Sequence, residues 1–141
     1  MADPTDDPGI SVFFTVEIDG VDLGSWTTCS GIGLSMSHEA RADSSMGFWM
    51  NHIPGAVTYN NITLGRPVSP DTSRVMAWMN SFATLPVPTA AQITAQDPMG
   101  GTVMTWSLWG VIPVRWTGPS FDAASPQIAT EQIEIAYQGF L

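Results

Sequence analysis

Short segments of alternating apolar and polar residues, separated by Gly and Pro, constrain the fold of this chain more than any other feature. Residues 12–18 alternate in steps of two, which is the spacing of a strand with one buried face. Asp19-Gly20 follows at once and supplies the residues that a tight hairpin needs at positive φ. The same alternation recurs over 102–109 and 127–137. These segments predict antiparallel strands.

Other parts of the chain complete this pattern. We expect a bulge or bend at Gly24, a bulge at Asn60-Asn61 and a loop over 42–55, where turn-forming residues gather. Strands at regular spacing with a single helix predict a mainly β fold, a small antiparallel β-barrel or sandwich with one α-helix packed on it. The remaining strands are expected over 21–30, 34–41, 56–64, 91–96 and 110–116.

One helix is predicted over 71–82. Val75, Trp78, Met79 and Phe82 follow at i, i+3, i+4 and i+7, so they form one apolar stripe. Ser69 or Asp71 can cap the helix, and the prolines at 86 and 88 prevent its continuation. We expect it to lie across an open end or face of the barrel. The expected core anchors are Phe14, Trp78, Phe82, Trp106, Ile133 and Ile135.

The length of 141 residues, 44% of them apolar, suits one domain with a real core. Residues 1–9 contain two prolines and three aspartates and offer little to bury, so they predict a flexible acidic N-terminal arm. The domain itself is expected over 10–141. No run of about 18 apolar residues is present, and the sequence therefore predicts no membrane-spanning segment.

The charge balance argues against one class of partner. The chain has thirteen acidic residues, four Arg and no Lys, and its formal net charge is −9. Stable nucleic-acid binding needs a basic surface, so it is not expected. Charged residues make up 12% of the chain, which is about half the usual share. We interpret this as a surface that faces other protein; a monomer covered by Ser, Thr, Asn and Gln is the alternative.

No constellation for catalysis, metal or cofactor is found. His38 lacks a second His four residues later, and Cys29-Ser30 lacks the glycine pattern of a nucleophile elbow. Glu131 and Glu134 are three apart, which places them on opposite faces of a strand. The chain is therefore not expected to be an enzyme. A carbohydrate-binding β-sandwich is an alternative of a different class, with Trp26, Trp49, Trp109 and Trp116 as the candidate stacking residues.

The expected loop over 42–55 is unusually apolar. It carries Met46, Phe48, Trp49 and Met50 between turn-forming residues at both ends. Such a loop either folds back on its own core or presents an apolar patch to a partner. These four residues are the candidate interface between subunits or rings.

The order of several motifs resembles the phage tail-tube family, whose members form the inner tubes of contractile tails and injection systems. Tyr59-Asn-Asn-Ile-Thr-Leu64, followed by Arg66, Asp71 and Trp78, is similar to the strand and helix at the centre of that family. The segment 131–140 is similar to its closing strand, and the resemblance covers residues 10–141. Met46 to Met50 departs from the family, which commonly has a polar glycine-rich loop there.

The resemblance implies a structural subunit of an inner tube. Six copies would form a ring, and stacked rings would enclose a channel for protein cargo or DNA inside a contractile sheath. Implied partners are further copies of the chain, the sheath protein and baseplate or tube-initiator proteins. The resemblance also implies assembly in the bacterial cytoplasm as part of a phage tail or phage tail-like particle.

The acidity of the chain has a possible place in such a tube. Glu17, Asp19, Glu131 and Glu134 are the candidate acids that face the channel, where negative charge would repel DNA phosphates and prevent sticking. The alternative is that these acids keep the outer rim soluble.

Overall fold

The computed structural model describes residues 12–43, 49–120, 123–124 and 129–141. The predicted acidic arm over 1–9 lies outside them. The described chain contains ten strands and one helix, which confirms the predicted mainly β class. The elements are β1 (Phe13–Ile18), β2 (Val21–Trp26), β3 (Thr28–Ser30), β4 (Leu34–Asp43), β5 (Trp49–Tyr59), β6 (Ile62–Pro67), α1 (Thr72–Thr84), β7 (Thr89–Gln96), β8 (Thr102–Thr117), β9 (Thr130–Ala136) and β10 (Gly139–Phe140).

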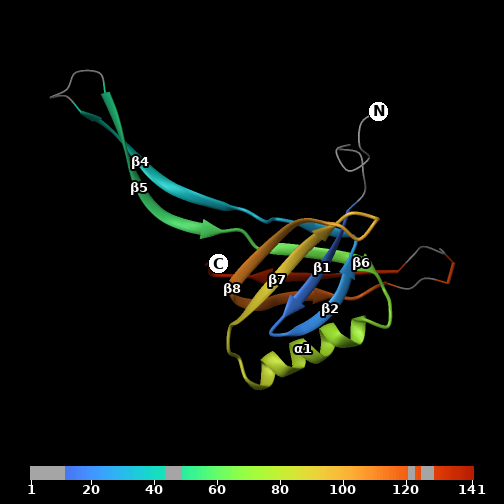
Figure 1. The fold of residues 1–141 in the computed structure, drawn as a ribbon. Helices are drawn as coiled ribbons and strands as arrows, with labels where there is room; N and C mark the ends of the chain where they lie inside the picture. The colour runs from blue at the N-terminus through green and yellow to red at the C-terminus, as the bar shows by residue number, and fades with distance from the viewer. Residues whose placement is uncertain (1–11, 44–48, 121–122, 125–128) are drawn as a thin grey trace, which may run out of the picture.

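The main sheet curls around a single core (Figure 1). Its strands pair in the order β2-β1-β7-β8-β9-β6-β3, and all of these pairs are antiparallel. The two end strands, β2 and β3, are separated by Thr27 alone. The Thr27 amide donates to the carbonyl of Gly65 on β6 at 2.9 Å. Because the first and last strands of the path are consecutive in the chain, the sheet curls back on itself as a small barrel whose end strands, β2 and β3, share no ladder.

Strand β8 changes its pairing partner on one side along its length. It pairs with β7 up to Val111 and with β9 from Ile112 onward. Gly110 lies at the change of partner with a φ of +66°, which L side chains rarely adopt. The sequence predicted two separate strands here, whereas the structure shows one long strand that serves both halves of the barrel.

The first hairpin forms as predicted. Asp19 and Gly20 have φ values of 53° and 74°, which suit a two-residue turn between antiparallel strands. The register of β1 on β2 shifts between Thr15 and Glu17. Gly24, with a φ of +88°, lies opposite this irregularity, in agreement with the predicted bend.

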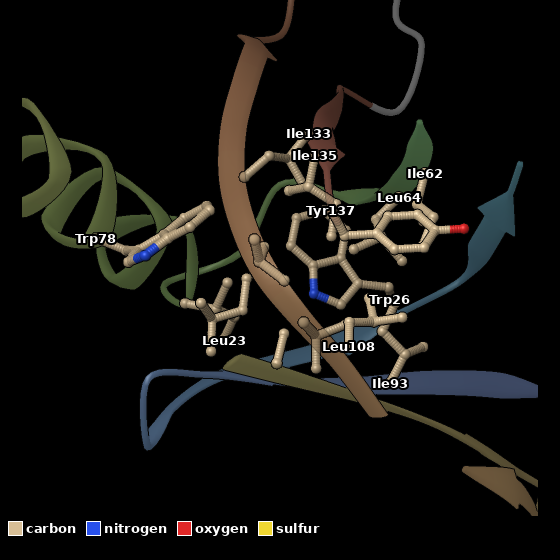
Figure 2. Close-up of a cluster of buried hydrophobic side chains, with 14 of the residues drawn as sticks. Leu23, Trp26, Ile62, Leu64, Trp78, Ile93, Leu108, Ile133, Ile135 and Tyr137 are labelled. Carbon is tan, nitrogen blue, oxygen red and sulfur yellow. The ribbon is translucent and has the colours of Figure 1, made fainter. Parts of the chain in front are cut away.

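The core lies inside the barrel and is closed on one side by α1 (Figure 2). Trp26 lies among the labelled side chains of the cluster, and Trp78 reaches toward them from the helix. Of the predicted anchors, Trp78, Ile133 and Ile135 are buried, while the half-buried Phe14 and Trp106 pack against the cluster. All five therefore contribute to the core.

Phe82 was wrongly predicted as a core anchor. It is half-buried and does not belong to the core cluster. Helix α1 buries Val75 and Trp78, and Met79 also packs against the core. The contact is therefore centred on the middle of the helix, and Phe82 lies a full turn beyond Trp78. Asp71 occupies the N-cap position without a side-chain cap hydrogen bond.

Strands β4 and β5 form a separate two-stranded hairpin that projects from the barrel (Figure 1). They pair from Leu34↔Tyr59 to Asp43↔Trp49. The predicted loop over 42–55 is wrong for its second half, because β5 begins at Trp49. Asn60-Asn61 is not a bulge within one strand but the break between β5 and β6, which belong to different sheets.

Candidate functional site

A buried ion pair lies inside the barrel between β6 and β9. Arg66 and Glu131 face each other in register, and Arg66 Nε donates to Glu131 Oε1 at 2.5 Å. The two side chains are 3% and 0% exposed. Glu131 was predicted to face a channel, and the structure shows that this is wrong. It lies two residues from Ile133, so it points to the same, inward face of β9.

Further donors hold the Glu131 carboxylate. Thr72 Oγ1 at the start of α1 donates to Oε1 at 3.0 Å, and Trp116 Nε1 on β8 donates to Oε2 at 3.1 Å. The carboxylate thus connects β9 with β6, β8 and α1. A buried carboxylate needs such donors, because the loss of hydration is costly unless charge and hydrogen bonds compensate it.

Arg66 on β6 lies beside β2, which is an end strand of the main sheet and shares no ladder with β6. Its Nη1 donates to the carbonyl oxygens of Leu23 at 2.6 Å and Ser25 at 3.4 Å. The guanidinium carbon also lies 3.9 Å from the centre of the Trp26 ring, within cation–π distance. The side chain therefore bridges β6 and β2 where the sheet order contains no ladder between them. This centre has a structural role in closing the barrel.

The other predicted channel acids do not lie on one surface. Glu17 on β1 is exposed and pairs with Asp22 and Gln92 on the neighbouring strands. Glu17 and Asp19 line the same shallow cavity of about 400 Å³. Ser107 and Leu141 also line it. This face of the barrel is polar and carries carboxylates.

Glu134 lies on another side of the barrel. Its half-buried side chain lines a smaller cavity of about 170 Å³ with Thr63 and Arg115, which flank it in register on β6 and β8. Strands β1 and β9 are three strands apart in a path of seven. The outward faces of Glu17 and Glu134 therefore look in roughly opposite directions, and a single channel wall cannot contain both.

The predicted apolar interface falls largely outside the described part of the chain. Met46 and Phe48 lie outside it, and for Trp49 and Met50 only their place in β5 is described. The structure shows a further apolar surface on the same hairpin that the sequence reading missed. Its exposed members are Leu34 (44%), Met36 (59%) and Val57 (42%).

The signal for this hairpin surface was available in the sequence. Leu34 and Met36 alternate on β4, and Val57 and Tyr59 alternate on β5. The structure pairs Leu34 with Tyr59 and Met36 with Val57, so the four side chains share one face. Tyr59 packs on the rings of Tyr137 and Phe140 at the barrel, while the other three are exposed. The apolar face thus begins at the barrel and continues onto the projecting hairpin.

The four tryptophans proposed for a stacking platform have separate environments. Trp26 is fully buried, and Trp116 packs against the core. Trp109 is 44% exposed, and the side chain of Trp49 is not described. Because two of the four belong to the core, the structure does not support a carbohydrate-binding platform.

The Cys29 thiol is free and partly buried. Burial raises the pKa of the Cys29 thiol to about 11, so the thiol stays protonated near neutral pH and is a poor nucleophile. Within the described ranges, no three His, Cys, Asp or Glu residues are grouped so that they could hold a metal ion. Helix α1, the one helix of the described residues, is not long and apolar enough to cross a membrane.

Comparison with known proteins decides the family. The family model described as T4-like virus tail tube protein gp19 matches residues 11–141. The chain belongs to the tail tube protein family. It is thus a structural subunit of the tail tube type. A search of curated protein sequences finds no match.

Solved structures share the tail tube fold. A chain of an extracellular contractile injection system, the PVC sheath–tube complex in its extended state, is 24% identical, with 100% of this chain and 97% of that chain covered and a TM-score of 0.77. A chain of the anti-feeding prophage (AFP) baseplate is 17% identical, with coverages of 100% and 96% and a TM-score of 0.71. Hcp1 from Flavobacterium johnsoniae is 12% identical, with coverages of 89% and 89% and a TM-score of 0.51.

Proposed function

We propose that this tail tube subunit assembles into six-membered rings that stack around a central channel. The observation that carries the proposal is the family match over residues 11–141. In this proposal the chain performs no catalytic step and needs no cofactor. It acts as a rigid conduit through which protein cargo or DNA passes.

The unpartnered hairpin supports assembly with further copies. A two-stranded hairpin alone is marginally stable in water, and three strands or packing on another element are needed for independent stability. Strands β4 and β5 pair only with each other in the described chain, and their exposed apolar residues lack a covering layer. A neighbouring subunit would supply that layer. Met46, Phe48, Trp49 and Met50 remain the candidate contacts between subunits or rings.

The sheath is the second proposed partner. The PVC structure is described as a sheath–tube complex, and related ones contain a sheath/tube terminator and a tube-terminating cap. We place this chain in an equivalent particle, assembled in the bacterial cytoplasm, with baseplate or tube-initiator proteins at one end. The particle is a phage tail or a phage tail-like injection system.

We further propose that the face of β1 with Glu17 and Asp19 lines the channel. The cavities on this face are lined by the carboxylates Glu17, Asp19 and Asp22, by the polar residues Thr15, Gln92, Thr94 and Ser107, and by a few apolar residues that include Ala90 and Leu141. A wall of this kind repels phosphates and offers little apolar surface to a passing cargo. Glu134 lies on the opposite side of the barrel, so it is not part of the proposed channel wall. The presence of Glu17 and Asp19 on the sheath-facing wall of an assembled tube would contradict this orientation.

Negative-stain electron microscopy of the purified full-length protein tests the assembly. Hollow rings or tubes with six-fold symmetry are expected. Exchange of both Phe48 and Trp49 for Ser should leave the subunit folded, as judged by circular dichroism, and prevent these particles from forming. A protein that remains a monodisperse monomer at every concentration tested would contradict the proposed function.

A further inference from the structure

Strands β6 and β9 present matching rows of buried side chains to the interior of the barrel. Each row has two apolar residues and one charged residue. The facing pairs are Ile62↔Ile135, Leu64↔Ile133 and Arg66↔Glu131. A slip of β9 by two residues would keep every side chain on its own face, because side chains alternate with a period of two. It would also leave an aliphatic pair in contact, either Leu64 with Ile135 or Ile62 with Ile133. Apolar packing between these strands therefore discriminates little between registers.

The connection that leads into β9 does not set its register either. In a tight hairpin, the type and length of the turn fix which residues face each other. Strand β8 ends at Thr117 and β9 begins at Thr130, so the twelve residues 118–129 join them. Strand β6 is more distant still along the chain, because it ends at Pro67. The entropy of a long connection changes little when its ends move by two residues.

The Glu131 carboxylate distinguishes the native register from a slipped one. It accepts from Arg66 Nε on β6 and from Trp116 Nε1 on β8, so it ties β9 to both of its neighbours. After a slip by two residues, Arg66 would face Ile133 or Ala129 in place of Glu131. A buried charge without its partner is far more costly than a changed aliphatic contact. The ion pair therefore penalises both slipped registers.

We infer that the Arg66–Glu131 pair selects the register of β9 and adds little net stability. The loss of hydration of two buried charges cancels most of their attraction, and apolar side chains of similar volume often replace such a pair without loss of stability. Apolar side chains cannot replace its selection of register. That selection reaches the hairpin, because a slip by two residues would move Tyr137 by about 7 Å along the strand. Its hydroxyl would then no longer donate to the Gly33 carbonyl, just before β4.

Pairs of introduced cysteines can report the register in the dilute subunit. Thr63 and Glu134 face each other and line the same small cavity on the outer surface. Thr63→Cys with Glu134→Cys should therefore form a disulfide in the native register, since facing residues bring their Cβ atoms within reach. Thr63→Cys with Ala136→Cys, or with Gln132→Cys, reports a slip by two residues in either direction. Cys29→Ala removes the native thiol from this background.

Three changes are then compared. Arg66→Met with Glu131→Met replaces the ion pair by apolar side chains. Glu131→Ile with Ile133→Glu moves the carboxylate two residues along β9, so that it faces Arg66 only after a slip. Leu64→Met with Ile133→Met is the matched control, because it alters the neighbouring facing pair and leaves both charges in place.

The readouts are the thermal unfolding midpoint and the ratio of slipped to native crosslinks, measured by non-reducing electrophoresis. The variant with Met at positions 66 and 131 should unfold within about 5 °C of the unmodified subunit, and its crosslink ratio should rise about tenfold or more. The variant with the moved carboxylate should crosslink mainly between positions 63 and 136. The control should crosslink as the unmodified subunit does.

A native crosslink in the variant with the moved carboxylate would overturn the inference. If that variant does not fold, the apolar variant decides: an unchanged crosslink ratio would overturn the inference. Failure of the apolar variant to fold would overturn it too, because the ion pair would then supply net stability. These readouts do not depend on ring formation, so the absence of rings from the unmodified protein would contradict the proposed function alone.

Discussion

The barrel and the β4–β5 hairpin differ in how far one chain completes them. In the barrel, seven strands pair in one path, the core side chains are buried, and the buried Glu131 carboxylate accepts hydrogen bonds from Arg66, Thr72 and Trp116. Among the described residues, the hairpin is a separate two-stranded sheet with exposed apolar residues. One chain is therefore sufficient to form the barrel, whereas in the proposed tube a neighbouring subunit covers the hairpin.

The largest effect on stability is expected at the buried ion pair. Arg66→Met leaves the Glu131 carboxylate buried without its cation and removes the donors to Leu23 and Ser25. We expect a loss of about 3–5 kcal/mol in the free energy of unfolding. Urea denaturation of the unassembled subunit measures it. A loss below about 1 kcal/mol, as for an exposed pair, would contradict the structural role given to this centre.

A smaller loss is expected for Gly24→Ala. Gly24 has a φ of +88°, and a Cβ there would lie 2.8 Å from Asp71 Oδ2 and 2.9 Å from Arg66 Nη1. The expected cost is about 1–3 kcal/mol from strain and crowding. Gly100→Ala is the matched control, because its φ is +86° but nothing lies within 4 Å of the added Cβ. Equal losses in the two variants, measured by urea denaturation, would show that the corner at Gly24 is not tightly packed.

Tyr137→Phe probes the junction between the two regions. The Tyr137 hydroxyl donates to the Gly33 carbonyl at 3.0 Å, just before β4 begins. Its loss should cost about 1 kcal/mol in thermal or urea unfolding. Because this bond holds the base of the hairpin, proteolytic cleavage within β4 and β5 should also become faster. Unchanged cleavage would mean that the aromatic packing of Tyr59 on Phe140 holds the base without it.

The smallest effect on stability is expected in the hairpin itself. Exchange of both Met36 and Val57 for Ser removes exposed apolar area, so the free energy of unfolding should change by less than about 0.5 kcal/mol. Assembly into rings, scored by electron microscopy, should be lost. The same exchange at Val21, which is 45% exposed but lies on the barrel, is the control. A hairpin variant that unfolds would show that the apolar face belongs to the core of its own subunit.

The two regions also differ in how well the sequence predicted them. The barrel strands and the Asp19-Gly20 turn carry local signals, namely a period of two and residues suited to positive φ. Strand β5 was predicted as a loop because Pro54 and Gly55 interrupt its pattern. A strand with a free outer side tolerates proline, and that condition depends on the sheet and not on the local sequence.

For the candidate acidic residues, too, the local sequence did not predict which residues lie together in space. Glu131 is in phase with the buried Ile133, but the sequence analysis predicted it to face a channel, because nothing local marks Arg66, 65 residues away, as its buried partner. Glu17 and Glu134 both have outward phase, yet the strand order places them on opposite sides of the barrel. Periodicity predicts which face of a strand is polar; only the closure of the sheet decides which polar faces form one surface.

Hydrogen exchange of the dilute subunit and of the assembled particle tests most directly whether a neighbour completes the hairpin. In the dilute subunit, amides of β4 and β5 should exchange within seconds, while those of β1, β7 and β9 should be protected. After assembly the hairpin amides should become protected as well, and the barrel should change little. A hairpin that is already protected in the dilute subunit, or that stays exposed in the assembled tube, would contradict the division between a complete barrel and an incomplete hairpin.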